Sequence, residues 1–223
     1  MFRKQQYLFD SARPVLTLFE NYGEADFAGL IRVQQESFPP PFPSELWWNE
    51  QQLSNHVRLF PAGAICAKVD GEVVGSVTGL VMNWTPGDAS HTWAEVTDSG
   101  YIRTHDANGN TLYIVDISVR PAFRKLGIGK ALMHCMYDVV SHLGLARVLG
   151  GARMPRYHEH AATMTPEQYL ESIVAGEIQD PIVTFLMRCG RVPVRVVHDY
   201  LDDEESANCA VLMEWRNPFR NQV

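Results

Sequence analysis

The sequence predicts a mixed α/β fold, with one central, mostly antiparallel sheet and helices on both of its faces. Short apolar runs separated by turn dipeptides such as Asp70-Gly71 indicate strands that are joined by tight hairpins. A strand, a helix and a second strand within residues 112–151 predict a parallel pair with a right-handed crossover. Internal repeats and low-complexity tracts are absent from the sequence, so a single domain is favoured.

Strand and helix signals alternate in the first half of the chain. Apolar residues at helical spacing predict a helix over 24–38, and the proline-rich run 39–43 ends it because proline has no N–H and fixes its own φ. Ser44 is the expected N-cap of a second helix that presents Leu53 and Phe60 on one side. Strands are expected at 15–19, 64–69 and 73–82.

The second half begins with a strand at 112–119, which follows a hairpin signal at Asn108-Gly109 and which Pro121 closes. Apolar residues in steps of three and four then predict a helix from Gly127 to Gly144. The remaining expected elements are a strand at 147–151, a helix at 165–176, a short helix that ends at Gly190, and a final hairpin of strands 192–197 and 209–215.

Length and charge limit the classes to which the protein can belong. The 223 residues carry 19 basic and 26 acidic side chains, a formal net charge of −7, which argues against nucleic-acid binding because that needs a basic surface. No apolar stretch approaches the roughly 18 residues that span a bilayer, and the N-terminus lacks the apolar core of a secretory signal. A cytoplasmic protein is expected, with a leader at 1–12, one domain at 13–217 and a tail at 218–223.

The spacing of cysteine and histidine predicts neither a metal site nor a disulfide framework. The cysteines lie far apart without a C-x-x-C pair, and His158 and His160 have no cysteine at ligand spacing. Reduced and mostly buried thiols are expected at Cys66, Cys135, Cys189 and Cys209.

The most informative segment is a basic, glycine-containing turn that leads from strand 112–119 into the next helix. The first turn of a helix has N–H groups without intrahelical acceptors and carries partial positive charge, so it binds anions well. Glycine at 127 and 129 lets an anion approach these N–H groups closely. Arg124, Lys125 and Lys130 add cations around the turn. The segment therefore predicts a pyrophosphate site.

Spacing decides which pyrophosphate ligand fits this turn. A P-loop would need glycine in place of Arg124 and a hydroxyl residue in place of Ala131, and a dinucleotide fingerprint fails at Leu132. The pattern R/Q-x-x-G-x-G/A is present as Arg124-Lys125-Leu126-Gly127-Ile128-Gly129. With the order of elements around it, this motif resembles the acyl-CoA loop of the GNAT superfamily of N-acetyltransferases, over residues 13–217.

The resemblance implies a donor substrate and the groups that hold it. In that family the strand before the loop splays from the strand after the helix, and the pantetheine arm of acetyl-coenzyme A (acetyl-CoA) enters the gap. Backbone groups of Ile117 and Val119 would bind this arm, and one of their N–H groups would polarise the thioester carbonyl. The turn from Arg124 to Lys130 would hold the pyrophosphate.

An amine acceptor has to lose a proton before it attacks the thioester. For a lysine-like amine with a pKa near 10.4 this costs roughly 4.6 kcal/mol at pH 7, so a general base is expected. Asp116 is the carboxylate nearest to the thioester site in the sequence, and hydrogen bonding that fixes the bulged strand is its alternative role. Several family members have the acidic residue where this chain has Val115. Glu95 and Asp98 are further candidates for the base.

A proton donor for the CoA thiolate is expected as well. Many family members use a tyrosine four residues before the glycine that ends the last helix, and counting back from Gly190 gives Leu186 here. Tyr157 is the expected substitute, with His158 and Tyr200 behind it and packing as its alternative role.

The acceptor side carries weaker signals. Its expected wall consists of residues 36–48, 84–98 and 153–160, where Arg153 anchors a ligand anion or forms an ordinary surface ion pair. An acidic run at 199–205 either attracts a cationic acceptor or is a solvated turn. The C-terminal half also resembles GNAT domains that are fused to carbon–nitrogen hydrolases, which implies a small amine or amide-related metabolite.

Two functions remain. The first is an N-acetyltransferase that moves an acetyl group from acetyl-CoA to a primary amine of a small molecule or peptide, by direct attack in a ternary complex. The second is an acyl-CoA-binding sensor of weak or absent catalysis, which Val115 and Leu186 motivate. The sequence leaves open the acceptor, the acyl length and the oligomeric state, a homodimer included.

Overall fold

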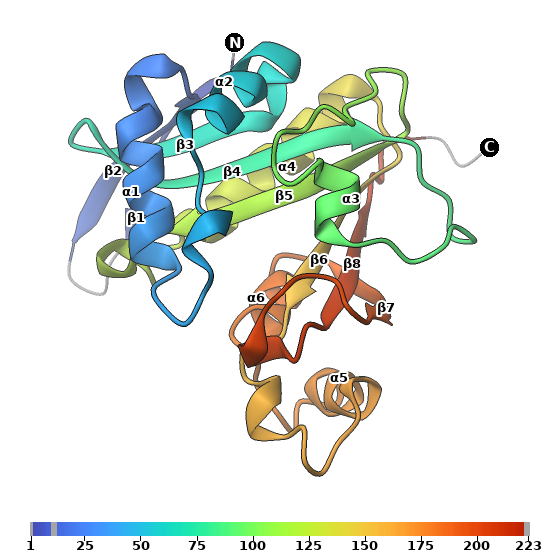
Figure 1. Ribbon diagram of the computed structural model, residues 1–223. Coiled ribbons are helices and arrows are strands. Elements are labelled where there is room, and N and C mark those ends of the chain that lie inside the picture. Colours follow the sequence, from blue (N-terminus) through green and yellow to red (C-terminus); the bar gives the residue numbers. More distant parts are fainter. Residues whose placement is uncertain (1, 10–12, 221–223) are drawn as a thin grey trace.

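The computed structural model describes residues 2–9 and 13–220 and has a single eight-stranded sheet across them (Figure 1). The strand order is β1-β2-β3-β4-β5-β6-β8-β7, in which β5 and β6 are parallel and the other neighbours are antiparallel. The strands are β1 (Arg3–Phe9), β2 (Pro14–Asn21), β3 (Ala64–Val69), β4 (Glu72–Met82), β5 (Thr111–Val119), β6 (Arg147–Arg153), β7 (Val192–Val197) and β8 (Ala210–Arg216).

Helices cover both faces of the sheet, which confirms the predicted fold class. On one face lie α1 (Phe27–Ser37), α2 (Glu50–Leu59) and α3 (Trp93–Thr97), and on the other lies α4 (Ile128–Leu143) (Figure 1). The C-terminal half adds α5 (Pro166–Ala175) and α6 (Val183–Arg188) between β6 and β7. Short 3-10 helices are η1 (Glu24–Asp26), η2 (Ser44–Leu46), η3 (Pro61–Gly63), η4 (Pro121–Phe123), η5 (Tyr157–Glu159) and η6 (Glu204–Ser206). Within the described residues, no helix has the length and apolarity needed to cross a membrane.

The N-terminal segment is part of the sheet, which corrects the expectation of a leader at 1–12. Residues 3–9 form β1, and this strand pairs along its whole length with β2. Leu8 of β1 is buried in the core. Because β1 reads Arg-Lys-Gln-Gln-Tyr-Leu-Phe, its apolar residues are too few to show strand alternation in the sequence. Residues 1 and 10–12, and residues 221–223 of the expected tail, lie outside the described part of the chain.

Two turn signals have roles that differ from their prediction. Ser44 begins η2, whereas α2 starts after Asn49, whose side chain accepts a hydrogen bond from the Gln52 N–H in a capping box. Asn108-Gly109 forms a tight turn just before β5, and the long segment 83–110, which includes α3, connects β4 to β5. A two-residue hairpin is therefore absent at this point.

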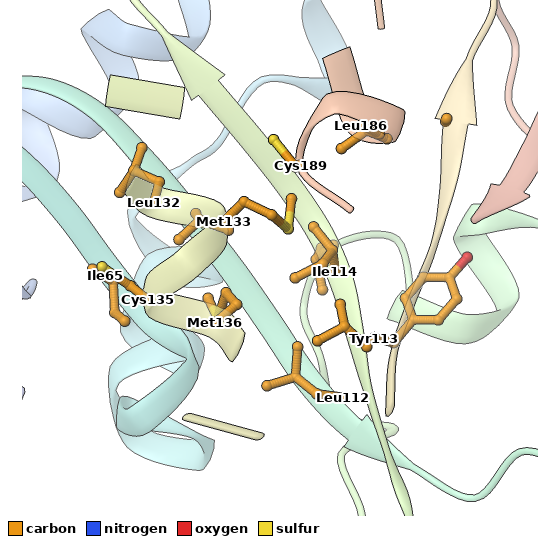
Figure 2. Close-up of a cluster of buried hydrophobic side chains, with 14 of the residues drawn as sticks. Ile65, Leu112, Tyr113, Ile114, Leu132, Met133, Cys135, Met136, Leu186 and Cys189 are labelled. Carbon is orange, nitrogen blue, oxygen red and sulfur yellow. The ribbon is translucent and has the colours of Figure 1, made fainter. Parts of the chain in front are cut away.

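The core between α4 and the sheet fixes the start of α4 in space. Leu132, Met133, Cys135 and Met136 of α4 are fully buried, and they face Ile65, Leu112 and Ile114 on the strands (Figure 2). Burial of each large apolar side chain contributes roughly 1.5–3 kcal/mol. A rigid α4 in turn holds its first turn at the end of β5.

The parallel pair of strands separates early. Only Thr111–Tyr113 of β5 pair with Arg147–Leu149 of β6, although both strands continue beyond these residues. The register between β4 and β5 shifts between Thr78 and Gly79, and Val115 is the additional residue on β5. Such a bulge bends its strand and increases the local twist. We call the point after Tyr113 and Leu149 the strand vertex, and the predicted splay of this pair is confirmed.

Candidate functional site

The first turn of α4 presents several free N–H groups. Gly127 is the N-cap, and no side chain caps the helix. The backbone N–H groups of Ile128, Gly129 and Lys130 have no acceptor within the described residues, while the Ala131 N–H bonds to the Gly127 carbonyl. Parallel N–H groups with the positive end of the helix dipole form an anion-binding arrangement.

The two positions of the turn require glycine for different structural reasons. Gly127 has φ 86° and ψ 5°, a left-handed conformation that costs other residues about 1–2 kcal/mol. A Cβ atom on Gly127 would meet no atom within 4 Å, so the space over this residue is open to a ligand. A Cβ atom on Gly129 would lie 3.2 Å from the Phe185 ring of α6. Gly129 therefore also allows α6 to pack closely against the start of α4.

The basic residues of the turn have different structural roles. Arg124 donates from Nε to the Val119 carbonyl over 3.1 Å and from Nη2 to the Ser37 carbonyl over 3.3 Å. Arg124 thus ties the turn to β5 and to the end of α1. Lys125 and Lys130 are exposed, and neither forms an ion pair within the described residues. These two cations are free to approach a bound anion.

The open edge of β5 lies between the vertex and this turn. Ile117 and Val119 are half-buried on β5, and Val119 has its carbonyl occupied by Arg124. Leu126 is half-buried against the core, and Ile128 is buried, so only the backbone of Ile128 is open to a ligand. The contact of Arg124 with the Val119 carbonyl therefore joins the predicted turn to the predicted backbone edge.

The bulge of β5 is tied to α3. Trp93 donates from its indole N–H to the Val115 carbonyl over 3.0 Å, and the Val115 side chain is buried. Glu95 accepts hydrogen bonds from Thr92 and caps α3, while Asp98 pairs with Arg103. Both carboxylates are already engaged at the ends of α3, and these contacts favour structural roles for Glu95 and Asp98 over the role of general base.

Asp116 lies on the face of β5 that α1 covers. Its carboxylate accepts hydrogen bonds from Gln34 Nε2 over 2.8 Å and from Ser118 Oγ over 3.0 Å. Burial in these surroundings raises the pKa of Asp116 to about 6, although both hydrogen bonds and the charge of Arg153 act in the opposite direction. Asp116 therefore combines a structural role in the strand with the pKa of a usable base.

Gln34 is a site residue that sequence reasoning missed. It is 2% exposed and also donates to Ser118 Oγ over 3.2 Å. A polar residue beside Leu30 and Val33 on the buried face of α1 was the available signal, because such a residue needs a polar partner inside the protein.

Tyr157 has a packed environment in η5. Its hydroxyl donates to the Met164 carbonyl over 2.9 Å, and its ring lies against Tyr169 of α5. Leu186 is buried on α6, at the position where the resemblance leads one to expect a tyrosine. These contacts favour packing, the alternative role of Tyr157, over the role of proton donor.

Arg153 lies on the side of the vertex where the sequence predicts the acceptor. It stands at the end of β6, with its guanidinium over the Phe42 ring at 4.8 Å, and it donates to both oxygens of Asp203. Arg153 thus forms an ion pair within the protein. To bind an anion of the ligand, it would have to leave Asp203. A cavity of about 110 Å³ lies beside it, lined by Pro41, Phe42, Pro43, Asp202, Asp203, Glu204 and Glu205.

Solved structures share this architecture. The GphF GNAT-like decarboxylase in complex with isobutyryl-CoA superposes with a TM-score of 0.77 at 19% identity, over 89% of this chain and 98% of that chain. The loading GNATL domain of CurA from Lyngbya majuscula gives a TM-score of 0.78 at 16% identity, over 92% and 99%. At these identities the likeness concerns the fold.

Two relatives from Bacillus subtilis (strain 168) are similar in sequence. The uncharacterized N-acetyltransferase YkwB is 49% identical over 216 residues, which cover 97% of this chain and 96% of that protein. The probable hydrolase YhcX is 35% identical over 209 residues, which cover 91% of this chain but 40% of that protein. The second match agrees with the resemblance to GNAT domains that are joined to hydrolases.

The family itself is shown by a sequence model. The model described as the acetyltransferase (GNAT) family matches residues 27–161, which run from the start of α1 past the end of β6. The match contains the bulged strand, the glycine turn and α4, the elements that form the site above. Fold, site and relatives agree, and this chain belongs to the GNAT acetyltransferase family.

Proposed function

We propose that this protein is an N-acetyltransferase that moves an acetyl group from acetyl-CoA to a primary amine of a small molecule or peptide. The carrying observation is the open N-terminus of α4 beside the separated strands β5 and β6. A turn with free N–H groups can bind the diphosphate of CoA, and an unpaired strand edge can pair with the amide-containing arm that follows it.

The donor is held mainly by backbone groups in this proposal. The N–H groups that follow Gly127 bind the diphosphate, and Lys125 and Lys130 add charge. The backbone of Ile117 and Val119 pairs with the pantetheine arm. Arg124 already bonds to the Val119 carbonyl but not to the Ile117 carbonyl. Leu126 and Ile128 support the turn from the core side.

Asp116 is the proposed general base. With a pKa of about 6 it is mostly ionised at pH 7, and it is a stronger base than an ordinary aspartate. It lies on the α1 face, next to the open part of β5, so that it receives the amine proton directly or through a water molecule. The amine nitrogen then attacks the thioester carbonyl, and the CoA thiolate leaves.

The acidic wall of the acceptor side supports an amine acceptor. The cavity beside Arg153 has four carboxylates, Asp202, Asp203, Glu204 and Glu205, and Asp203 already balances Arg153. The surplus negative charge attracts a protonated amine and disfavours an anionic acceptor. The name of the relative YkwB as an N-acetyltransferase supports the same class of reaction.

The second candidate is an acyl-CoA sensor that binds the donor without efficient transfer. The buried Leu186 on α6 favours it, because no hydroxyl is available there for the thiolate. Both candidates place CoA at the same turn, and they differ only in turnover.

One experiment separates the two candidates. Purified protein is titrated with acetyl-CoA by calorimetry, and the thiol released in the presence of amines, amino acids, polyamines and peptides is then recorded. Thiol release that depends on one acceptor class establishes the transferase. Binding without release on any acceptor establishes the sensor, and absence of binding would refute both.

A further inference from the structure

Arg191 immediately precedes β7, and only 3% of its surface is exposed. Its Nη2 atom donates to the Gly150 carbonyl of β6 over 3.3 Å and to the Met213 carbonyl of β8. Its Nε atom is buried and has no hydrogen-bond partner among residues 2–9 and 13–220. A guanidinium in this position is unusual, because buried charges are normally paired.

Arg191 has no carboxylate partner within the described residues. The titratable groups around it are Tyr137 of α4, Cys189 after α6, Tyr113 of β5 and Tyr200 of the β7–β8 loop. Burial raises the pKa of Cys189 to about 11 and of Tyr200 to about 12, and it raises those of Tyr113 and Tyr137 as well. All four groups are therefore neutral at pH 7, and none balances the guanidinium.

Arg191 itself keeps its charge under these conditions. Burial lowers its pKa to about 10, which still leaves the guanidinium protonated at pH 7. The fold thus holds one positive charge, with no negative partner, inside an apolar environment where electrostatic effects reach far because they are weakly screened.

This charge lies at the strand vertex. A Cβ atom on Gly150 would lie 3.2 Å from the Ile114 carbonyl and 3.4 Å from Arg191 Nη2. Gly150 and Ile114 are the first residues beyond the last paired residues of β6 and β5, Leu149 and Tyr113. The guanidinium therefore occupies the point where the two strands part, on the face that α4 covers, since Ile114 points to α4 (Figure 2).

The opposite face of the vertex holds a pair of phenols. Tyr113 and Tyr200 share a hydrogen bond of 2.8 Å, and His91 Nε2 lies 3.1 Å from the Tyr113 hydroxyl. Gly151 makes room for them, because a Cβ atom there would lie 2.5 Å from the Tyr200 hydroxyl. The groups named around the vertex are thus one guanidinium, two phenols and an imidazole, and no carboxylate is among them.

The proposed transfer produces an anion beside this vertex. When the amine nitrogen bonds to the carbonyl carbon, the C–S bond breaks and its electron pair leaves with sulfur as the CoA thiolate. The ammonium group first gives one proton to Asp116, directly or through water, the nitrogen loses a second proton to solvent after the attack, and the thiolate later takes a proton from solvent. We infer that Arg191 is a positioning residue whose unbalanced charge stabilises the thiolate form of CoA at the strand vertex. This inference rests on the proposed function.

If Arg191 had only a structural role, a different result would be expected. Arg191 would then only link the carbonyls of β6 and β8, and its charge would have no effect on the ligand. Arg191→Met keeps the length of the side chain and removes the charge, whereas Arg191→Lys keeps the charge and loses the forked geometry. Arg58→Met removes an exposed charge on α2 and is the matched control.

The test measures ionisation of the CoA thiol in the binary complex, which needs no acceptor. Thiolate absorbance in the ultraviolet is recorded against pH for the complex with CoA, and the complex with desulfo-CoA supplies the protein background. We expect the thiol in the wild-type complex to titrate at least one pH unit below free CoA, a tenfold shift. Arg191→Met should restore the value of free CoA, while Arg191→Lys and Arg58→Met should keep most of the shift.

A second measurement needs no variant. Calorimetry on the wild-type protein should give CoA a growing advantage over desulfo-CoA as pH rises through the thiol titration, because only CoA becomes an anion at sulfur. CoA that binds with an unshifted thiol and no such advantage would overturn the role of Arg191 and leave the proposed function standing. If neither CoA nor desulfo-CoA binds, the proposed function fails, and the inference fails with it.

Discussion

Arg153 at the end of β6 and Asp203 in the β7–β8 loop form a bidentate ion pair, with Nε–Oδ2 and Nη2–Oδ1 distances of 2.7 and 2.6 Å. The Asp203 side chain is 4% exposed, and Arg153 also reaches Glu205 over 3.1 Å. Because Arg153 lies over Phe42 as well, this pair joins the loop between α1 and α2 to the loop between β7 and β8. It therefore shapes the cavity that Phe42 and Asp203 line.

Arg153→Met should destabilise the protein by about 3–5 kcal/mol, because it leaves the buried Asp203 carboxylate without its partner. Urea denaturation measures the free energy of unfolding. The double variant Arg153→Met with Asp203→Asn removes both charges and should recover a large part of the loss. Equal losses in the single and double variants would show that the pair is not coupled.

Gly127→Ala should weaken acetyl-CoA binding at least tenfold. The added methyl group enters the space above the first N–H groups of α4, which is open in the structure. Gly144→Ala is the matched control, because Gly144 also has positive φ and an open Cβ direction but lies at the other end of α4. Both variants should lose about 1–2 kcal/mol of stability. Calorimetry should show weaker binding for Gly127→Ala alone, and equal affinities would place the diphosphate elsewhere.

Asp116→Asn should lower kcat by about 10²- to 10⁴-fold, as expected for loss of a general base. In the wild-type enzyme the rate should rise with pH up to about 6, where Asp116 loses its proton, and the variant should lack this limb. Asp138→Asn on the exposed side of α4 serves as the control. A variant with the wild-type rate and pH profile would assign Asp116 to the strand structure alone.

The same substitution has a predicted effect on stability. Because the folded state raises the pKa of Asp116 from 3.8 to about 6, the native protein binds more protons than the unfolded chain between these values. The contribution of Asp116 to the free energy of unfolding is therefore most favourable below pH 4, and it decreases as the pH rises to 6. Asp116→Asn should be more stable than wild type by about 3 kcal/mol at pH 7.5, and this difference should fall below about 1 kcal/mol at pH 4. Urea denaturation at both pH values tests the sign.

Tyr157→Phe should leave kcat within about twofold of wild type, because the Tyr157 hydroxyl donates to the Met164 carbonyl. The loss of this hydrogen bond should cost about 1 kcal/mol of stability. A fall in kcat of about 10²-fold or more, with unchanged acetyl-CoA affinity, would instead establish Tyr157 as the proton donor. Steady-state kinetics with the acceptor identified by thiol release provide the measurement.

Local signals predicted most of the elements. The start of α4 at Gly127 and its end at Gly144 follow from backbone conformations that favour glycine, and both residues have positive φ. The strand β1 escaped prediction because its pairing partner, β2, supplies the stability that its own polar sequence lacks.

The anion-binding turn was determined by the sequence itself, since the motif at 124–130, the helix that follows it and the free N–H groups all lie within one short segment. The tertiary structure alone decided what surrounds that turn. Gln34 reaches Asp116 from 82 residues away, Arg153 reaches Asp203 from 50, and Arg191 reaches the Gly150 carbonyl from 41. Burial and charge pairing depend on these distant contacts, and so the raised pKa of Asp116, the Arg153–Asp203 ion pair and the unbalanced guanidinium exist only once the sheet has assembled.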